Sequence, residues 1–212
     1  SRNGARAQVD STTGEAGDLR IVHYHRELLL EKGGVVRAVL DICTGLAAAK
    51  HEVILLSPTI ADVPDAWKQH ADGAPAASEV PWPGRMGRFD SAALRAIDAF
   101  LEGADVLHLH GMWGPFNVQL ARLAKQRGIP YVYSVHGMLD DWCMAQRGLK
   151  KRNYLALMGR RCLEEAAAVH CTAQAELDQA RVVSAAEISS PVNPGEERVV
   201  TVRLDPLGDC LA

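Results

Sequence analysis

The sequence predicts an α/β fold in which a mainly parallel sheet carries helices on both faces. Strand-like runs and helix-like periodicities alternate from residue 19 to about residue 182, and this alternation favours parallel strands joined by right-handed crossovers. Val53–Leu56 is apolar at every position, as expected for a strand covered on both faces. Val35–Ala49 repeats apolar residues over a wide stripe at helical spacing, which suits a helix packed on a sheet.

The remaining elements follow from the same two periodicities. Further strands are expected at Leu19–His25, Val106–His110, Tyr131–Val135 and Ala168–Cys171. Further helices are expected at Ser91–Leu101, Asn117–Arg127, Lys150–Ala167 and Ala173–Arg181. Residues 58–90 hold five of the ten prolines, so we expect this segment to be irregular apart from one short strand.

The predicted domain covers residues 19–182, with a tail on either side. Residues 1–18 are polar and have no hydrophobic period, which is typical of a disordered tail. Residues 183–212 break the alternation of strands and helices and are expected to be an irregular tail, in which Val199–Leu204 could form one strand.

Composition and missing motifs exclude several classes of function. A net charge of −3 gives no signal for nucleic acid, and no apolar run approaches the roughly 20 residues of a membrane-spanning helix. The five cysteines are odd in number and lack C-x-x-C spacing, which disfavours zinc or disulfide frameworks and favours a cytoplasmic setting. The glycine fingerprint of dinucleotide-binding dehydrogenases does not follow the first strand, and the P-loop and the hydrolase nucleophile elbow are also missing.

A pair of glycines, Gly33 and Gly34, stands after the first strand at the start of a helix. Ligands of open α/β sheets bind beyond the carboxyl ends of the strands. Backbone N–H groups at a helix start can approach an anion such as a phosphate there. An ordinary glycine turn would give the same pattern.

Two histidine–glycine steps leave the ends of successive strands. His110 is followed by Trp113, and His136 is followed by Asp140 and Asp141. Imidazoles donate hydrogen bonds to hydroxyl or phosphate oxygens, and indole faces suit sugar rings. We therefore expect these residues at one rim, although packed strand-end side chains are an alternative interpretation.

A metal site is a weaker interpretation of the histidines. His108 and His110 would share one face of a regular strand and could bind zinc. Hydrogen-bonded histidines in buried strands explain the pattern better than a metal pair does, so we expect no metal.

The segment Arg147–Arg161 carries six basic residues beside apolar side chains. Such a helix could lie on an anionic membrane or hold an acidic acceptor. A solvated basic face over a buried apolar stripe is the alternative.

Three segments carry a resemblance to a known family: GGVVRAVLDICTGLAAAKHEVILLS, ADVLHLHGMWGPFNVQLARLAKQRGIPYVYSVHGMLDDW and KKRNYLALMGRRCLEEAAAVHCTAQAE. They resemble the N-terminal domain of family 4 retaining glycosyltransferases, over about residues 19–181. The resemblance implies the N-terminal, Rossmann-like half of a GT-B fold, in which this half binds the acceptor and a second domain binds most of an NDP-sugar. It also implies glycosyl transfer with retention and no bound cofactor or metal.

The same resemblance implies roles for individual residues. Gly33 and Gly34 match the glycine loop near the donor diphosphate. His136 matches the strand-end histidine that contacts the donor sugar, and it is the expected catalytic residue. The cleft on the acceptor side is expected to be lined by His110, Trp113, Asp140 and Asp141. The expected partners are an NDP-sugar and a glycan or lipid-linked acceptor in polysaccharide biosynthesis, at the inner face of the membrane.

The sequence also departs from the family pattern. Lys50 stands where a helix-ending glycine is common, and Asp141 stands where a proline is common. The paired glutamates and the basic diphosphate clamp of the family's second domain have no counterpart. We therefore expect a partial chain that is inactive alone, or alternatively a non-catalytic module that binds a glycan or a partner enzyme.

Overall fold

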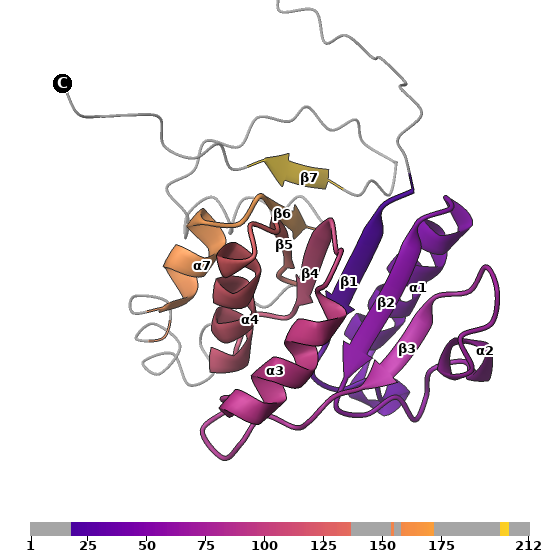
Figure 1. Cartoon of the computed structure of the whole chain (residues 1–212), viewed down its shortest axis with the longest axis horizontal. Helices are drawn as coiled ribbons and strands as arrows, with labels where there is room; N and C mark the ends of the chain where they lie inside the picture. Colours follow the sequence, from indigo (N-terminus) through magenta and orange to yellow (C-terminus); the bar gives the residue numbers. More distant parts are fainter. Residues whose placement is uncertain (1–17, 137–153, 155–157, 172–199, 204–212) are drawn as a thin grey trace, which may run out of the picture.

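The computed structural model describes residues 18–136, 154 and 158–171, together with the backbone of residues 200–203. A single seven-stranded sheet runs through it in the order β3-β2-β1-β4-β5-β6-β7 (Figure 1). The strands are β1 (Arg20–Tyr24), β2 (Glu52–Ser57), β3 (Ala76–Glu79), β4 (Val106–His110), β5 (Tyr131–Ser134), β6 (Ala168–Cys171) and β7 (Val200–Arg203). Strands β1 to β6 pair in parallel, and only β7 is antiparallel. The predicted mainly parallel sheet is confirmed, and the carboxyl ends of six strands share one edge.

Helices join the strands in the predicted alternation. They are η1 (Leu30–Lys32, a 3-10 turn), α1 (Gly34–Ala48), α2 (Asp65–Lys68), α3 (Ser91–Phe100), α4 (Pro115–Gln126) and α7 (Arg160–Glu164). The short strand expected within residues 58–90 is β3, and the short helix α2 beside it was not predicted. The predicted helix end at Ala167 is wrong, because α7 stops at Glu164 and the chain turns before β6. The helix expected at Ala173–Arg181 lies outside the described residues.

Two apolar cores lie on opposite faces of the sheet. The face covered by α3, α4 and α7 buries alternate residues of β1, β4 and β5, among them Val22, Leu107 and Tyr133. The other face is covered by α1 and α2, where Val39 and Trp67 pack with residues of β2. In Figure 1, α3 and α4 lie in front of the sheet and α1 lies behind it. Helices therefore cover both faces, as predicted.

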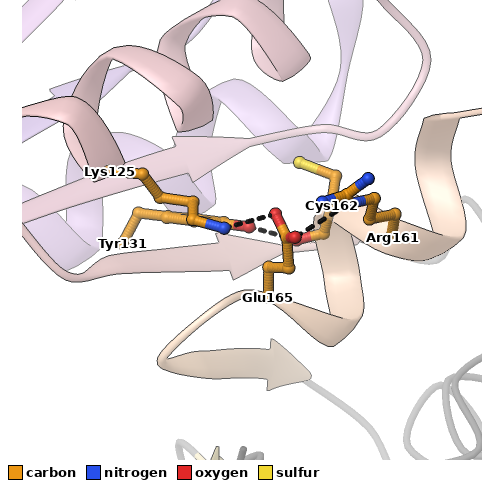
Figure 2. A network of polar contacts seen from close by, with 5 residues as sticks. All are labelled: Lys125, Tyr131, Arg161, Cys162 and Glu165. Atoms are coloured by element: carbon orange, nitrogen blue, oxygen red, sulfur yellow. Dashed lines mark hydrogen bonds and ion pairs between the residues drawn. The ribbon is translucent and has the colours of Figure 1, made fainter.

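A polar network joins α7 to α4 and to β5 at the amino edge of the sheet. Figure 2 shows Glu165 between two cations, 2.8 Å from Lys125 Nζ and 2.8 Å from Arg161 Nε. The buried Tyr131 hydroxyl donates to the Cys162 carbonyl oxygen at 2.6 Å. The groove between α4 and α7 that these residues line is far from the carboxyl edge, so we assign the network a structural role.

The end of α1 shows how Lys50 replaces a glycine. The Lys50 N–H donates to the Ala47 carbonyl at 2.9 Å, and the His51 N–H donates to the Leu46 carbonyl at 3.1 Å. This pair of backbone hydrogen bonds ends many helices and requires a residue in the left-handed conformation, which is usually glycine. Lys50 adopts that conformation with φ of 72°, so this departure from the family pattern places a strained residue there.

Both predicted tails extend beyond what the structure describes. Residues 1–17 lie outside the described residues, and so do most of residues 183–212. Strand β7 comes from this second segment, at the position where Val199–Leu204 was expected to form one strand. Within the part of the chain that the structure describes, no helix is both long and apolar enough to cross a bilayer.

Candidate functional site

Polar side chains replace the apolar core on one face of β1, β4, β5 and β6. The register places His23 beside His108, and Ser134 between His110 and His170. Because side chains alternate along a strand, all of these point to the same face, and the opposite face keeps the apolar residues. We call this group, together with His136 at the end of β5, the histidine cluster.

Three imidazoles of the cluster form one hydrogen-bonded chain. His136 Nε2 lies 3.0 Å from His110 Nδ1, and His110 Nε2 lies 2.9 Å from His23 Nδ1. His136 is partly exposed, whereas His110 is 1% exposed and His23 is fully buried. The chain therefore runs from the carboxyl edge of the sheet into its interior.

A second chain of hydrogen bonds lies beside the first. The Ser134 hydroxyl is 2.7 Å from His108 Nε2 and 2.7 Å from His170 Nδ1. The ring of His108 stacks on that of His110, with centroids 4.1 Å apart and planes 27° apart. The two chains are thus packed together, and each supports the ring positions of the other.

Burial keeps these imidazoles neutral at ordinary pH. Loss of solvation lowers the pKa of His23 to about 3 and the pKa of His136 to about 4. Burial, together with the neighbouring imidazoles, holds the pKa of His108 and His110 well below the usual value. A neutral imidazole has one N–H donor and one acceptor nitrogen, so each ring can link two partners.

His136 itself has an unusual backbone. Its φ of 49° lies in the left-handed region, which side-chain-bearing residues adopt infrequently and at a cost. This conformation directs the imidazole back over the end of β5 and onto His110. A strained residue at the edge where ligands bind in parallel sheets is consistent with a functional position.

The cluster also contains the only group of potential metal ligands found among the described residues. Nitrogens of His23, His108 and His110 lie within 4.8 Å of one another. However, His108 Nε2 lies 2.7 Å from the Ser134 hydroxyl, so one of the two nitrogens of that ring already has a partner. Both nitrogens of His110 are also engaged by other imidazoles. The geometry favours a hydrogen-bonded array, and the expectation of no metal stays a prediction.

The glycine pair lies at the same edge of the sheet as His136, because both follow parallel strands. Gly33 has φ of 105° and ψ of −161°, a combination available essentially only to glycine. A Cβ at either glycine would meet no atom within 4 Å, so the space in front of both is open. No side chain caps the first N–H groups of α1. These groups can therefore approach an anionic ligand.

The model of the glycosyl transferase 4-like domain matches residues 33–188. This chain belongs to that family. No curated protein sequence matches the chain.

Two solved structures share the fold of this glycosyl transferase 4-like domain. Both are of HepE from Anabaena, one in complex with UDP and glucose and one in complex with UDP. The TM-scores are 0.55 and 0.54, with 14% sequence identity in each case. Each match covers 78% of this chain and 41% of HepE, so the chain spans less than half the length of those proteins. The likeness establishes a Rossmann-like fold of the GT-B type.

The predicted site residues of the glycosyl transferase 4-like domain fall into different places. His110 and His136 are in contact at 3.0 Å, but His110 is 1% exposed and is buried within the sheet. Trp113 is half-buried, packs against the α3/α4 core and lies edge-on to Tyr154 at 5.7 Å. Asp140 and Asp141 lie outside the described residues. The acceptor roles of these residues stay predictions.

Sequence reasoning missed His23, Ser134 and His170 as parts of the site. The signal was present in the alternation of side chains along the predicted strands. His23 and His108 each lie two residues before the last residue of a predicted strand, on the face opposite the apolar residues. What was lacking was the order of the strands, which places β1 next to β4.

Proposed function

We propose that this domain takes part in glycosyl transfer from an NDP-sugar, with His136 at the donor sugar and the Gly33–Gly34 loop at the diphosphate. The observation that supports it best is the placement of both groups at one edge of the sheet, with open space in front of the glycines. A diphosphate leaving group gains negative charge as the glycosidic bond breaks, so preorganised backbone N–H groups stabilise the transition state most.

His136 suits contact with a sugar because it is neutral. Its lowered pKa leaves one N–H and one lone pair at physiological pH. A neutral imidazole can hydrogen-bond a sugar hydroxyl without adding positive charge near the anomeric carbon, where positive character develops during transfer. A charged imidazole would oppose that development.

The acceptor side of the proposal is a glycan or lipid-linked molecule at the inner face of a membrane. Basic residues of Arg147–Arg161 would contribute by attracting anionic lipid. Arg160 and Arg161 are paired with Glu164 and Glu165 at 2.7 and 2.8 Å, which offsets their charge. The membrane contact therefore depends on the basic residues near position 150, outside the described residues.

A non-catalytic binding module is the second candidate function. By the family resemblance, most donor contacts come from a second domain, and the chain spans less than half of HepE. The few backbone N–H groups of the glycine loop contribute about 1 kcal/mol each. We therefore expect the chain alone to bind a donor no more tightly than about 1 mM, roughly 4 kcal/mol, and to show no turnover.

Titration of the chain with UDP and with UDP-glucose, monitored by NMR of the backbone amides and the imidazoles, tests the proposal. Saturable shifts should appear at Gly33, Gly34 and His136, and Gly33→Ala should abolish them. Gly73→Ala is the matched control, because Gly73 is also left-handed with φ of 73° and has open space at its Cβ. If a panel of NDP-sugars at several millimolar causes no shift at these residues, the proposed donor site is wrong.

Transfer should be restored by a second domain. A fusion of this chain to the C-terminal domain of a family member is expected to transfer sugar, and His136→Ala in that fusion should abolish transfer. Micromolar donor binding or steady turnover by the unfused chain would show that this half is more complete than we propose.

A further inference from the structure

The buried end of the imidazole chain decides which nitrogen of His136 carries its proton. Three neutral imidazoles in a row can hold their protons in two ways, since each has one N–H. In the first, His136 donates from Nε2 to His110, and His110 donates to His23. In the second, both hydrogen bonds run the other way, from His23 to His110 and from His110 to His136.

The two arrangements differ at His23 Nε2, the atom at the buried end of the imidazole chain. This atom is buried and has no hydrogen-bond partner among the described residues. In the first arrangement it would be a buried N–H without an acceptor. In the second it is a bare lone pair, because the proton of His23 sits on Nδ1. Buried N–H groups without an acceptor are rarer in folded proteins than under-satisfied acceptors.

At the His136 end of the imidazole chain, the solvent does not favour either of the two proton arrangements. His136 is partly exposed, so water can donate to its Nδ1 or accept from it equally well. The preference of the buried end is therefore transmitted along the two hydrogen bonds of 2.9 and 3.0 Å. His110 cannot break the transmission, because both of its nitrogens are committed and it is almost completely buried.

We propose that His23 and His110 are positioning residues that fix His136 as the Nδ1–H tautomer, so that His136 acts as a hydrogen-bond donor at the ligand edge. The group that accepts this hydrogen bond is an oxygen, such as a sugar hydroxyl or a phosphate oxygen. The assignment of this oxygen to a nucleotide-sugar rests on the proposed function. The assignment of the tautomer does not depend on it.

Nitrogen-detected NMR of the imidazoles in the full chain tests the tautomer directly at pH 7.5. His136 should show a protonated, pyrrole-type Nδ1 and an unprotonated, pyridine-type Nε2, and His23 should show the same pattern. A protonated Nε2 at His136 would overturn the proposal. Addition of UDP-glucose separates the two ideas: the Nδ1–H tautomer without any ligand-induced shift would support the tautomer and oppose the proposed function.

Variants of His110 test the transmission. His110→Phe removes the donor to His136 Nε2 and should give a mixture of both tautomers at His136. His110→Asn can place an amide N–H toward the same nitrogen and should restore the Nδ1–H form. Amide spectra establish that both variants are folded. A His136 that keeps one tautomer unchanged in a folded His110→Phe variant would show that His110 does not position it.

Discussion

Mild acid should unfold this domain through its buried histidines. The folded state keeps the pKa of His23, His108, His110 and His136 below the ordinary 6.5, whereas the unfolded chain takes up protons near that value. Below pH 6.5 the unfolded state therefore binds more protons, and stability falls with pH. The loss begins near pH 6.5 and continues toward about 4 for His136 and about 3 for His23.

The magnitude follows from proton linkage. One pH unit below an unfolded pKa of 6.5, a histidine that stays neutral in the folded state costs about 1.4 kcal/mol. Four such histidines cost about 6 kcal/mol at pH 5.5 relative to pH 7.5 or above. His25, whose pKa is also lowered by burial, adds to the loss in the same direction. Because domains have a total stability of about 5–15 kcal/mol, this loss removes much of the stability at a pH where few other groups titrate.

Urea unfolding followed by circular dichroism at pH 7.5, 6.5, 6.0 and 5.5 measures this loss. His23→Leu removes one of these groups and should reduce the pH-dependent loss by about 1.4 kcal/mol at pH 5.5. His70→Gln is the control, because its side chain is exposed, and it should leave the loss unchanged. A free energy of unfolding that falls by less than about 1.4 kcal/mol between pH 7.5 and 5.5 would refute the account of a neutral buried cluster.

Substitutions at three further positions test local features by the same unfolding assay. Lys50→Gly should raise the free energy of unfolding by about 1 kcal/mol, because glycine adopts the left-handed helix end without strain; no gain would argue against that strain. Gly114→Ala should lower it by about 1–3 kcal/mol, since its Cβ would come within 2.1 Å of the buried Phe116 ring; an unchanged midpoint would show that the ring moves freely. Asp90→Ala should cost about 1 kcal/mol, because Asp90 caps α3 by accepting from the Ala93 N–H at 2.8 Å, and Asp90→Asn should recover most of it.

Much of the fold could be predicted because its signals are local. Strands β4 and β6 have the bounds expected from their apolar runs, and α3 begins at Ser91, the residue expected to open that helix. The short helix α2 was missed because prolines dominate its surroundings and four residues are too few for a helical period. The end of α7 was misplaced because the alanines before β6 continue the apolar pattern without forming a turn of helix.

The site was less predictable because it depends on contacts between distant strands. The meeting of His110 and His136 follows from their equivalent places at the ends of neighbouring strands. The burial of His110 depends on His23, which lies 87 residues away in sequence and is brought close by the position of β1 beside β4. Periodicity identifies which face a side chain occupies, but not which neighbours it finds there.

The antiparallel strand β7 has a consequence for the behaviour of the chain in concentrated solution. Strand β6 is buried along its whole length, and β7 occupies the backbone groups on its outer side. Without β7, these groups would form an open, largely apolar edge of the kind that recruits strands from other molecules. Pairing with β7 therefore covers the buried strand β6 and moves the outer edge of the sheet to β7.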